Sequence, residues 1–168
     1  MVASKPVPRW SPASMGLFKI NSDVALRVSG IEVVIRDWKG RVRVSFCYNL
    51  AANLQPQVTE ALAILKGIRL ASSMGLVPAI VESEALTMVD AIRSQVAPCI
   101  DVGVIIHDIF KEVPVYGISK IGFVPLLVNM VAQGLARLAL DFVGESLWLD
   151  DCPLAAESLV LGDCPISL

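Results

Sequence analysis

The chain has 168 residues, of which 55% are hydrophobic and only 18% are charged, and its formal net charge is -2 at pH 7. Average soluble domains contain about 25% charged residues. Disorder needs low hydrophobicity and high net charge, so the composition excludes a disordered chain and predicts one domain with a substantial core. A pI of about 5.4 gives no overall basic field for nucleic acid, although a local basic surface is compatible with it.

A mean hydropathy of +0.66 raises the question of a membrane span. The most hydrophobic long window, Val124 to Val143, has about the length that a bilayer requires. Its polar residues recur at every fourth position and form one stripe, which is typical of an amphipathic helix over a core; they are Asn129, Gln133, Arg137 and Asp141. No apolar run of signal-peptide length follows the N-terminal Lys5 and Arg9. We therefore expect an intracellular protein, cytoplasmic or nuclear, that is neither secreted nor membrane-bound.

The cysteines are scattered, without a CxxC pair, and His107 is the one histidine of the sequence. A zinc site needs Cys and His at ligand spacing, so none is indicated. We expect free, buried thiols in a reducing compartment, and a surface position for His107.

In chain order, the sequence first predicts an extended lead-in at residues 1–16, which are rich in proline. Three strands follow, the third with strict alternation of apolar and polar residues; they are residues 17–25, 31–35 and 41–48. An Asp and a Gly between the second and third strands indicate a turn, so we expect an antiparallel meander.

Helical periodicity begins at Gln55-Pro56, since proline is well tolerated in the first turn of a helix. This first helix continues to about Gly75 and is followed by a strand at 78–81. Two helices come next, one from Glu84 to about Ser94 with Ser83 as its N-cap, and one capped by Asp101. A strand at 115–124 and a helix at 126–143 complete the series. The order β-β-β-α-β-α-α-β-α predicts an α/β domain at residues 17–143, with a five-stranded mixed sheet and helices on both faces. Residues 144–168, which contain no Lys or Arg, are expected to form an acidic tail.

Three acidic residues are candidates for chemistry. Asp23 lies in the first strand among residues expected to be buried, Glu60 in the first turns of the long helix, and Glu84 directly after a strand. Carboxylates that converge inside a fold are costly unless cations or metal neutralise them, and such convergence builds Mg²⁺ sites. The alternative, that Glu60 and Glu84 only favour the positive ends of helix dipoles, stays open.

Several sequence motifs, in the same order along residues 9–163, resemble one family, the plant RNase H-like domain of the reverse-transcriptase-associated type found in retrotransposon-derived proteins. The motifs are Arg9-Trp10-Ser11-Pro12, Gly16-Leu17-Phe18-Lys19-Ile20-Asn21-Ser22-Asp23, Gly30-Ile31-Glu32-Val33-Val34-Ile35-Arg36-Asp37, Thr59-Glu60-Ala61-Leu62-Ala63, Ile80-Val81-Glu82-Ser83-Glu84, Asn129-Met130-Val131-Ala132-Gln133, Leu147-Trp148-Leu149-Asp150 and Leu159-Val160-Leu161-Gly162-Asp163.

The resemblance implies an RNase H-like fold and cleavage of the RNA strand of an RNA–DNA hybrid by two Mg²⁺ ions on four carboxylates. The first three positions fall on Asp23, Glu60 and Glu84, with Glu84 where the family has Asp, and these three would be the remaining catalytic and metal-binding residues. The fourth falls on Gln133, a neutral amide where catalytic members have Asp.

The family's His-Val-Pro-Arg-Glu-x-Asn motif has lost its titratable residues here, because Phe123, Leu126 and Leu127 replace the His, Arg and Glu. We therefore expect a nucleic-acid-binding domain, for RNA–DNA hybrid or RNA, with a degraded Mg²⁺ site and little or no cleavage. Two alternatives remain: a protein–protein interaction module, which includes self-association, and an active Mg²⁺-dependent hybrid ribonuclease.

A basic hairpin is the candidate nucleic-acid surface. Eight of the fourteen Lys and Arg residues lie at or before position 43. Lys39, Arg41 and Arg43 alternate along one strand, with Arg36 before the turn, so they can contact phosphates; an ordinary solvated face is the open alternative. Trp38 at the turn fits base stacking or packing over the hairpin.

Overall fold

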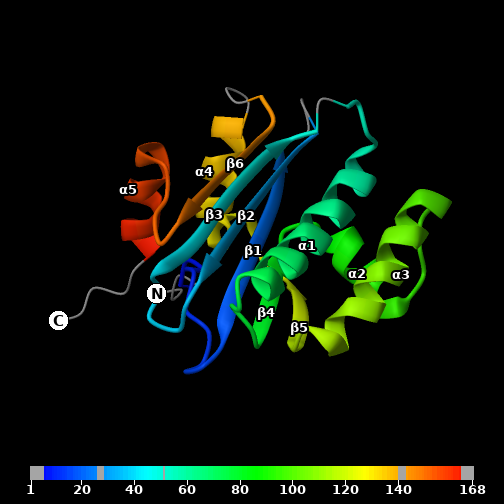
Figure 1. The fold of residues 1–168 in the computed structure, drawn as a ribbon, viewed down its shortest axis with the longest axis horizontal. Helices are drawn as coiled ribbons and strands as arrows, with labels where there is room; N and C mark the ends of the chain where they lie inside the picture. Colours follow the sequence, from blue (N-terminus) through cyan, green and yellow to red (C-terminus); the bar gives the residue numbers. More distant parts are fainter. Residues whose placement is uncertain (1–5, 26–28, 51, 140–142, 164–168) are drawn as a thin grey trace, which may run out of the picture.

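The computed structural model describes residues 6–25, 29–50, 52–139 and 143–163. One mixed sheet forms its centre, with three helices on one face and two on the other (Figure 1). The strands are β1 (Phe18–Ala25), β2 (Gly30–Arg36), β3 (Val42–Asn49), β4 (Ala79–Ser83), β5 (Ile118–Phe123) and β6 (Glu145–Leu149). The helices are α1 (Pro56–Ser73), α2 (Leu86–Ser94), α3 (Ile100–Val115), α4 (Met130–Ala139) and α5 (Leu154–Asp163).

The sheet order is β5-β4-β1-β2-β3-β6. β1, β2 and β3 form the expected antiparallel meander, and β4 and β5 run parallel to β1 through helical crossovers. This arrangement puts the carboxyl ends of β1 and β4 side by side at one end of the sheet. The candidate acid Asp23 lies near the end of β1, and Glu84 follows β4 directly. The predicted α/β class, mixed sheet and element order up to α4 are confirmed.

The expected count of five strands is wrong, because β6 adds a sixth by pairing antiparallel with β3. β6 and α5 both lie after residue 143, in the segment expected to be an acidic tail. β6 is a five-residue edge strand in which Ser146 and Trp148 are half-buried and the other three residues are exposed. A strand so short and so exposed has little hydrophobic pattern, while the acidic residues around it are typical of a solvated tail.

Two helices begin later than predicted. α2 starts at Leu86, not at Glu84, and Ser83 acts within the turn, where its Oγ accepts the N–H of Ala85 at 3.2 Å. The predicted helix at 126–143 is divided into a short 3-10 turn at Leu126–Val128 and α4. The N–H groups of Val128 and Asn129 bond three residues back, to Pro125 and Leu126, which tightens this turn. Residues 140–142 lie outside the described residues.

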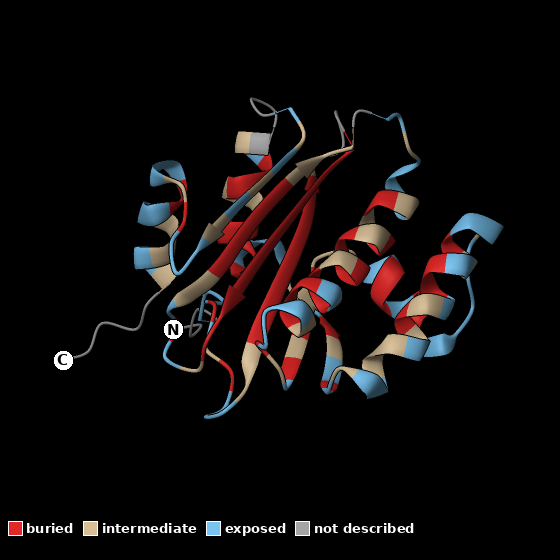
Figure 2. Ribbon diagram, viewed as in Figure 1, coloured by how far each residue is buried: buried red, intermediate tan, exposed pale blue. Residues whose placement is uncertain are grey.

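The core has two layers, one on each face of the sheet, and the central strands are buried along most of their length (Figure 2). The larger layer packs α1, α2 and α3 against residues such as Ile20, Val33 and Phe46. The smaller one packs α4 and α5 against Val34 and Cys47. β1 and β2 therefore present alternate residues to different layers, so that Asp23 and Glu32 point to the smaller one.

No helix among the described residues combines the length and the apolar character that a membrane crossing needs. The high hydropathy is instead accounted for in part by α1, whose buried residues include Ala61, Ile64 and Ile68. Among the cysteines, Cys47 and Cys152 are buried thiols and Cys99 is half-buried, while Cys164 lies outside the described residues.

Candidate functional site

Asp23 and Glu32 form the centre of the candidate site. They are directly opposed in the β1–β2 pair, so their side chains lie side by side on one face of the sheet. Asp23 is 4% exposed and Glu32 is fully buried. One Asp23 carboxyl oxygen accepts the N–H of Val24 at 2.8 Å, whereas neither Glu32 oxygen has a hydrogen-bond partner among the described residues.

Glu60 and Glu84 border a surface cavity of about 370 Å³ between the first turns of α1 and α2. Pro56 opens α1, so Glu60 lies in the second turn of that helix, and Glu84 lies in the short link between β4 and α2. One carboxyl oxygen of each is buried without a hydrogen-bond partner in the described structure. The three acids that the sequence singled out thus come from β1, α1 and the end of β4.

Burial raises the pKa of all four carboxyls, and for Asp23, Glu32 and Glu60 the charges of other acids in the group raise it further. Burial, followed by the charge of Glu84, raises the pKa of Asp23 to about 7, although the Val24 N–H works against this. Burial, followed by the charges of Asp23 and Glu84, raises the pKa of Glu60 to about 8. Burial, followed by Asp23 and Glu60, raises the pKa of Glu32 to about 9. The pKa of Glu84 is raised by burial and lowered by a hydrogen bond from Asn129.

Asn129 connects the site to α4. Its Nδ2 donates to the carbonyl oxygen of Ser22 at 3.0 Å, beside Asp23, and its Oδ1 is buried without a hydrogen-bond partner in the described residues. Gln133 follows one turn later, and its N–H bonds the carbonyl of Asn129. Residues four apart share a helix face, so Asn129, just before α4, and Gln133, within it, provide two amides and no acid.

Mg²⁺ is the cofactor that the resemblance implies, and the donor set fits it chemically. Mg²⁺ prefers oxygen ligands, and the site supplies buried carboxyl oxygens on Glu32, Glu60 and Glu84 that make no hydrogen bonds within the described residues. In that same part of the chain, no three acidic, thiol or imidazole groups are already arranged around one ion position. Cation binding therefore requires rotation of these side chains toward a common point.

Glu32 was missed by the sequence reasoning, although a signal existed. It is an acid within an apolar strand, Gly30 to Ile35, and a short connection between β1 and β2 sets it opposite Asp23. A charged residue inside a strand buried on both faces is costly, which is the same argument that selected Asp23.

Arg36, expected on the basic surface, is 1% exposed and lies inside the protein. Its guanidinium stacks over the Trp10 ring, 3.5 Å from the ring centroid, and pairs with Asp163 of α5 at 2.9 Å. Trp10 Nε1 in turn donates to Asn21 at 3.0 Å. Arg36 therefore fixes the N-terminal segment and α5 to the sheet.

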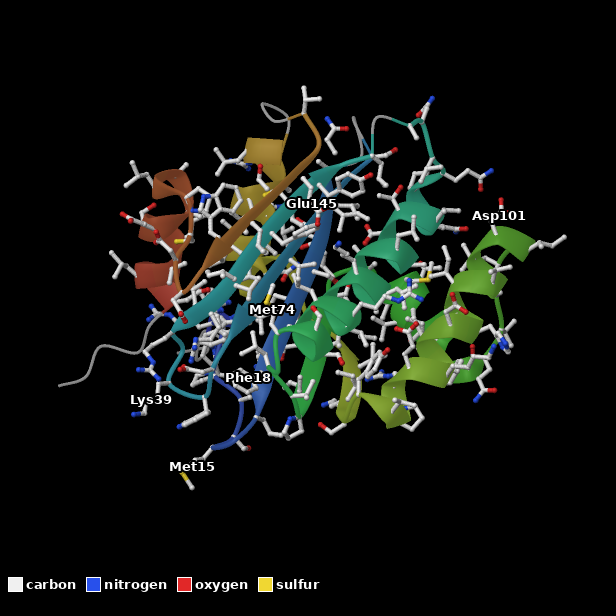
Figure 3. All side chains as sticks on the ribbon, viewed as in Figure 1. Met15, Phe18, Lys39, Met74, Asp101 and Glu145 are labelled. Atoms are coloured by element: carbon white, nitrogen blue, oxygen red, sulfur yellow. The ribbon has the colours of Figure 1, made fainter. Side chains whose placement is uncertain are left out.

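The other three basic residues reach the surface at the β2–β3 hairpin. Lys39 is exposed and projects outward from the turn (Figure 3). Arg41 pairs with Asp37 at 2.7 Å, and Arg43 pairs with Asp150. These ion pairs partly neutralise the positive charge of the basic hairpin. A phosphate that bound there would therefore have to compete with both carboxylates.

Aromatic and apolar residues complete the surroundings. Trp38 is half-buried and packs edge-to-face on Phe18, with ring centroids 6.3 Å apart, as expected for packing over the hairpin. Phe123, Leu126 and Leu127 are exposed between β5 and α4. His107 is exposed on α3, in agreement with the expected surface position.

The architecture defines the class of protein. The fold matches the crystal structure of RNase H1 from the halophilic archaeon Halobacterium salinarum NRC-1, with a TM-score of 0.67 and 16% sequence identity, over 75% of this chain and 98% of that chain. At this identity the match establishes an RNase H-like fold, as expected. No curated protein sequence is significantly similar to the chain. Residues 21–139 match the model of the reverse transcriptase-like family, and the chain belongs to that family.

Proposed function

We propose that this domain binds RNA-containing nucleic acid, an RNA–DNA hybrid or RNA, and cleaves little of what it binds. The observation that carries the proposal is the composition of the acidic site: the charge of Glu84 acts on both Asp23 and Glu60, while α4 has the neutral Gln133 where the resemblance implies an acid. Family membership and the RNase H-like fold support nucleic acid as the ligand class, and Mg²⁺ as the cation.

Low cleavage follows from the charge of the site. When bound, divalent cations in such a site activate water and stabilise the leaving oxygen. Gln133 contributes no charge to hold them, and the Glu84 side chain is one methylene longer than the Asp that the resemblance implies. Phe123, Leu126 and Leu127 offer neither a proton nor a cation to a scissile phosphate.

The binding surface runs from the acidic site toward the basic hairpin. Glu32 and Arg36 are four residues apart on β2, which corresponds to about 13 Å along a strand, and Lys39 lies in the turn that follows. A ligand that reaches both regions must be extended, as a nucleic-acid duplex is. Arg41 and Arg43 would exchange Asp37 and Asp150 for phosphates on binding.

Binding is tested with a labelled RNA–DNA hybrid across a series of salt concentrations. The double variant Arg41→Ala, Arg43→Ala is expected to bind the hybrid several-fold more weakly. The slope of the logarithm of the binding constant against the logarithm of the salt concentration should decrease in magnitude by at most about two. Arg69→Ala is the matched control, because Arg69 is an exposed, ion-paired arginine on the α1–α3 surface. Binding without salt dependence, or unchanged in the double variant, would contradict the proposal.

Cleavage is tested on the same hybrid with Mg²⁺ and with Mn²⁺. The expected result is no product above that of Asp23→Asn, which removes the central charge. Product formed by the unmodified protein and lost in Asp23→Asn would identify an active ribonuclease instead.

The second candidate function is protein binding, and the exposed Phe123, Leu126 and Leu127 favour it. Adjacent exposed apolar side chains are a common feature of interaction surfaces. Sedimentation that shifts with protein concentration, and that is abolished by Leu126→Ser with Leu127→Ser, would support self-association through this segment.

A further inference from the structure

Glu32 is a fully buried carboxyl group without a stabilising partner in the described structure. Its side chain is 0% exposed, and neither Oε1 nor Oε2 accepts a hydrogen bond within that part of the chain. An ionised carboxylate removed from water costs several kcal/mol unless it is paired. Such a group in a folded protein requires an explanation.

The charges around Glu32 do not compensate it. Its strand neighbours are Asp23 on β1 and Cys47 on β3, and the acidic groups that act on it are Asp23 and Glu60. On the α4 side, the smaller core layer contributes the apolar Val131 and Leu135.

The cationic side chains nearest along these strands are committed elsewhere. Lys19 pairs with Glu82 at 2.8 Å, and Arg36 pairs with Asp163. None of the ion pairs within the described residues involves Glu32, Asp23, Glu60 or Glu84.

A second buried polar atom, on a side chain bonded to the residue before Asp23, also lacks a partner in the described structure. Asn129 is 0% exposed, and its Oδ1 accepts no hydrogen bond within the described structure, while its Nδ2 is fixed on the Ser22 carbonyl. Carboxyl and amide oxygens are ligands that hard divalent cations prefer. The two unpartnered groups come from different elements, β2 and the residue before α4. Glu32 is opposite Asp23, and Asn129 is bonded to the carbonyl of Ser22, which precedes Asp23.

We propose that Glu32 is a ligand of a divalent cation, which it binds together with Asp23 and Glu60. The negative charge that α4 lacks at Gln133 is thus supplied from the sheet, by the strand next to Asp23. This inference goes beyond nucleic-acid binding, because it concerns cation binding by the protein alone.

The test uses Mn²⁺ as the probe, with no nucleic acid present. The cation-free protein is titrated while free Mn²⁺ is measured by electron paramagnetic resonance. The unmodified protein is expected to bind Mn²⁺, and Glu32→Gln to bind it at least about tenfold more weakly, since even residues that only support a ligand affect metal affinity 10- to 100-fold. Glu112→Gln, on the surface of α3 and paired with Arg69, is the matched control and should bind as the unmodified protein does.

A second variant separates ligation from folding. Glu32→Met has a side chain of similar length without a charge, and is expected to melt at a higher temperature than the unmodified protein when no cation is present. Added Mg²⁺ should raise the melting temperature of the unmodified protein but not that of Glu32→Met. Absence of Mn²⁺ binding by the unmodified protein, or equal binding by Glu32→Gln, would overturn the proposal. Neither outcome depends on hybrid binding, which the arginine variants test separately.

Discussion

Asp23 on β1 and Glu32 on β2 stand directly opposite each other in the antiparallel ladder, and both carboxyls are buried. Like charges at opposed positions of a strand pair destabilise it. The fold accommodates the pair by favouring its protonated forms. Burial, followed by the charge of Glu84, raises the pKa of Asp23 to about 7, and burial, followed by the charges of Asp23 and Glu60, raises that of Glu32 to about 9. At neutral pH without a cation, Glu32 is therefore protonated and Asp23 is about half ionised.

The first prediction is that the cation-free protein loses stability as pH rises from about 5 to 9. Glu32 titrates near its ordinary value of 4.5 in the unfolded chain and near 9 in the folded one. Between these values the folded state binds more protons than the unfolded state, so the free energy of unfolding falls with pH. The stabilisation is complete below 4.5 and is lost as pH approaches 9. The slope is at most about 1.4 kcal/mol per pH unit for each such proton.

Urea unfolding at a series of pH values measures this slope. Glu32→Gln removes one titrating group and is expected to flatten it, whereas Glu112→Gln should leave it unchanged. Identical slopes for Glu32→Gln and the unmodified protein would show that Glu32 does not titrate in this range.

The second prediction concerns the buried arginine. Asp163→Asn removes the carboxylate that pairs with Arg36, which is 1% exposed. The loss is expected to be about 1–3 kcal/mol, because a buried charge is left with less compensation. Asp150→Asn breaks the more exposed pair with Arg43 and should cost less than about 1 kcal/mol. Chemical denaturation measures the free energy of unfolding of both variants. Equal losses in the two variants would contradict a structural role for the buried pair of Arg36 with Asp163.

Sequence patterns were sufficient for the meander and for the alternation of strands and helices that follows. Residues 41–46 alternate strictly, and α1 has a proline at its start and a long apolar face, so both are strong local signals. β6 gave no such signal. On this exposed edge strand only every second side chain is half-buried, so no strong hydrophobic pattern is required, and the acidic residues around it are typical of a tail.

Tertiary contacts explain where the candidate site departed from expectation. Arg36 precedes the turn that leads into the basic stripe. Only the positions of Trp10 and Asp163, far away in sequence, show that its charge is used internally. Glu32 required the register of β2 against β1, which sets it beside Asp23. Local sequence identifies an unusual residue, whereas the pairing partner determines its use.

The third prediction is that Gly67→Ala destabilises the protein although alanine favours helix. A Cβ at Gly67 would lie 2.8 Å from Cγ2 of Ile20, in the layer between α1 and the sheet. The gain in helix propensity is about 1 kcal/mol, while overpacking a closed core costs about 1–3 kcal/mol, so a net loss in thermal unfolding is expected. In α5, a Cβ at Gly162 would meet no heavy atom within 4 Å. Gly162→Ala should thus be neutral or stabilising, and a stabilised Gly67→Ala would show that α1 can move away from the sheet.

The fourth prediction is a gain of activity in Gln133→Asp. Gln133 lies one turn after Asn129, whose side chain contacts the Ser22 carbonyl and Glu84, so an acid at 133 would face the same site. The added carboxylate should strengthen divalent cation binding, and Gln133→Asp combined with Glu84→Asp is expected to cleave an RNA–DNA hybrid at least about tenfold above the unmodified protein. A tenfold change needs only about 1.4 kcal/mol of transition-state stabilisation.

The controls test whether cleavage depends on where the added negative charge lies or only on its presence in the protein. Gln57→Asp adds the same charge on α1, at the cavity that Glu60 and Glu84 line, and should not produce cleavage. Asp23→Asn, introduced into the Gln133→Asp, Glu84→Asp protein, should remove the product, because Asp23 is the central acid of the site. If the double variant binds Mn²⁺ more tightly and still leaves the hybrid intact, missing charge is not what limits cleavage. The exposed Phe123, Leu126 and Leu127, which provide no cation for the phosphate, would then be the next positions to change.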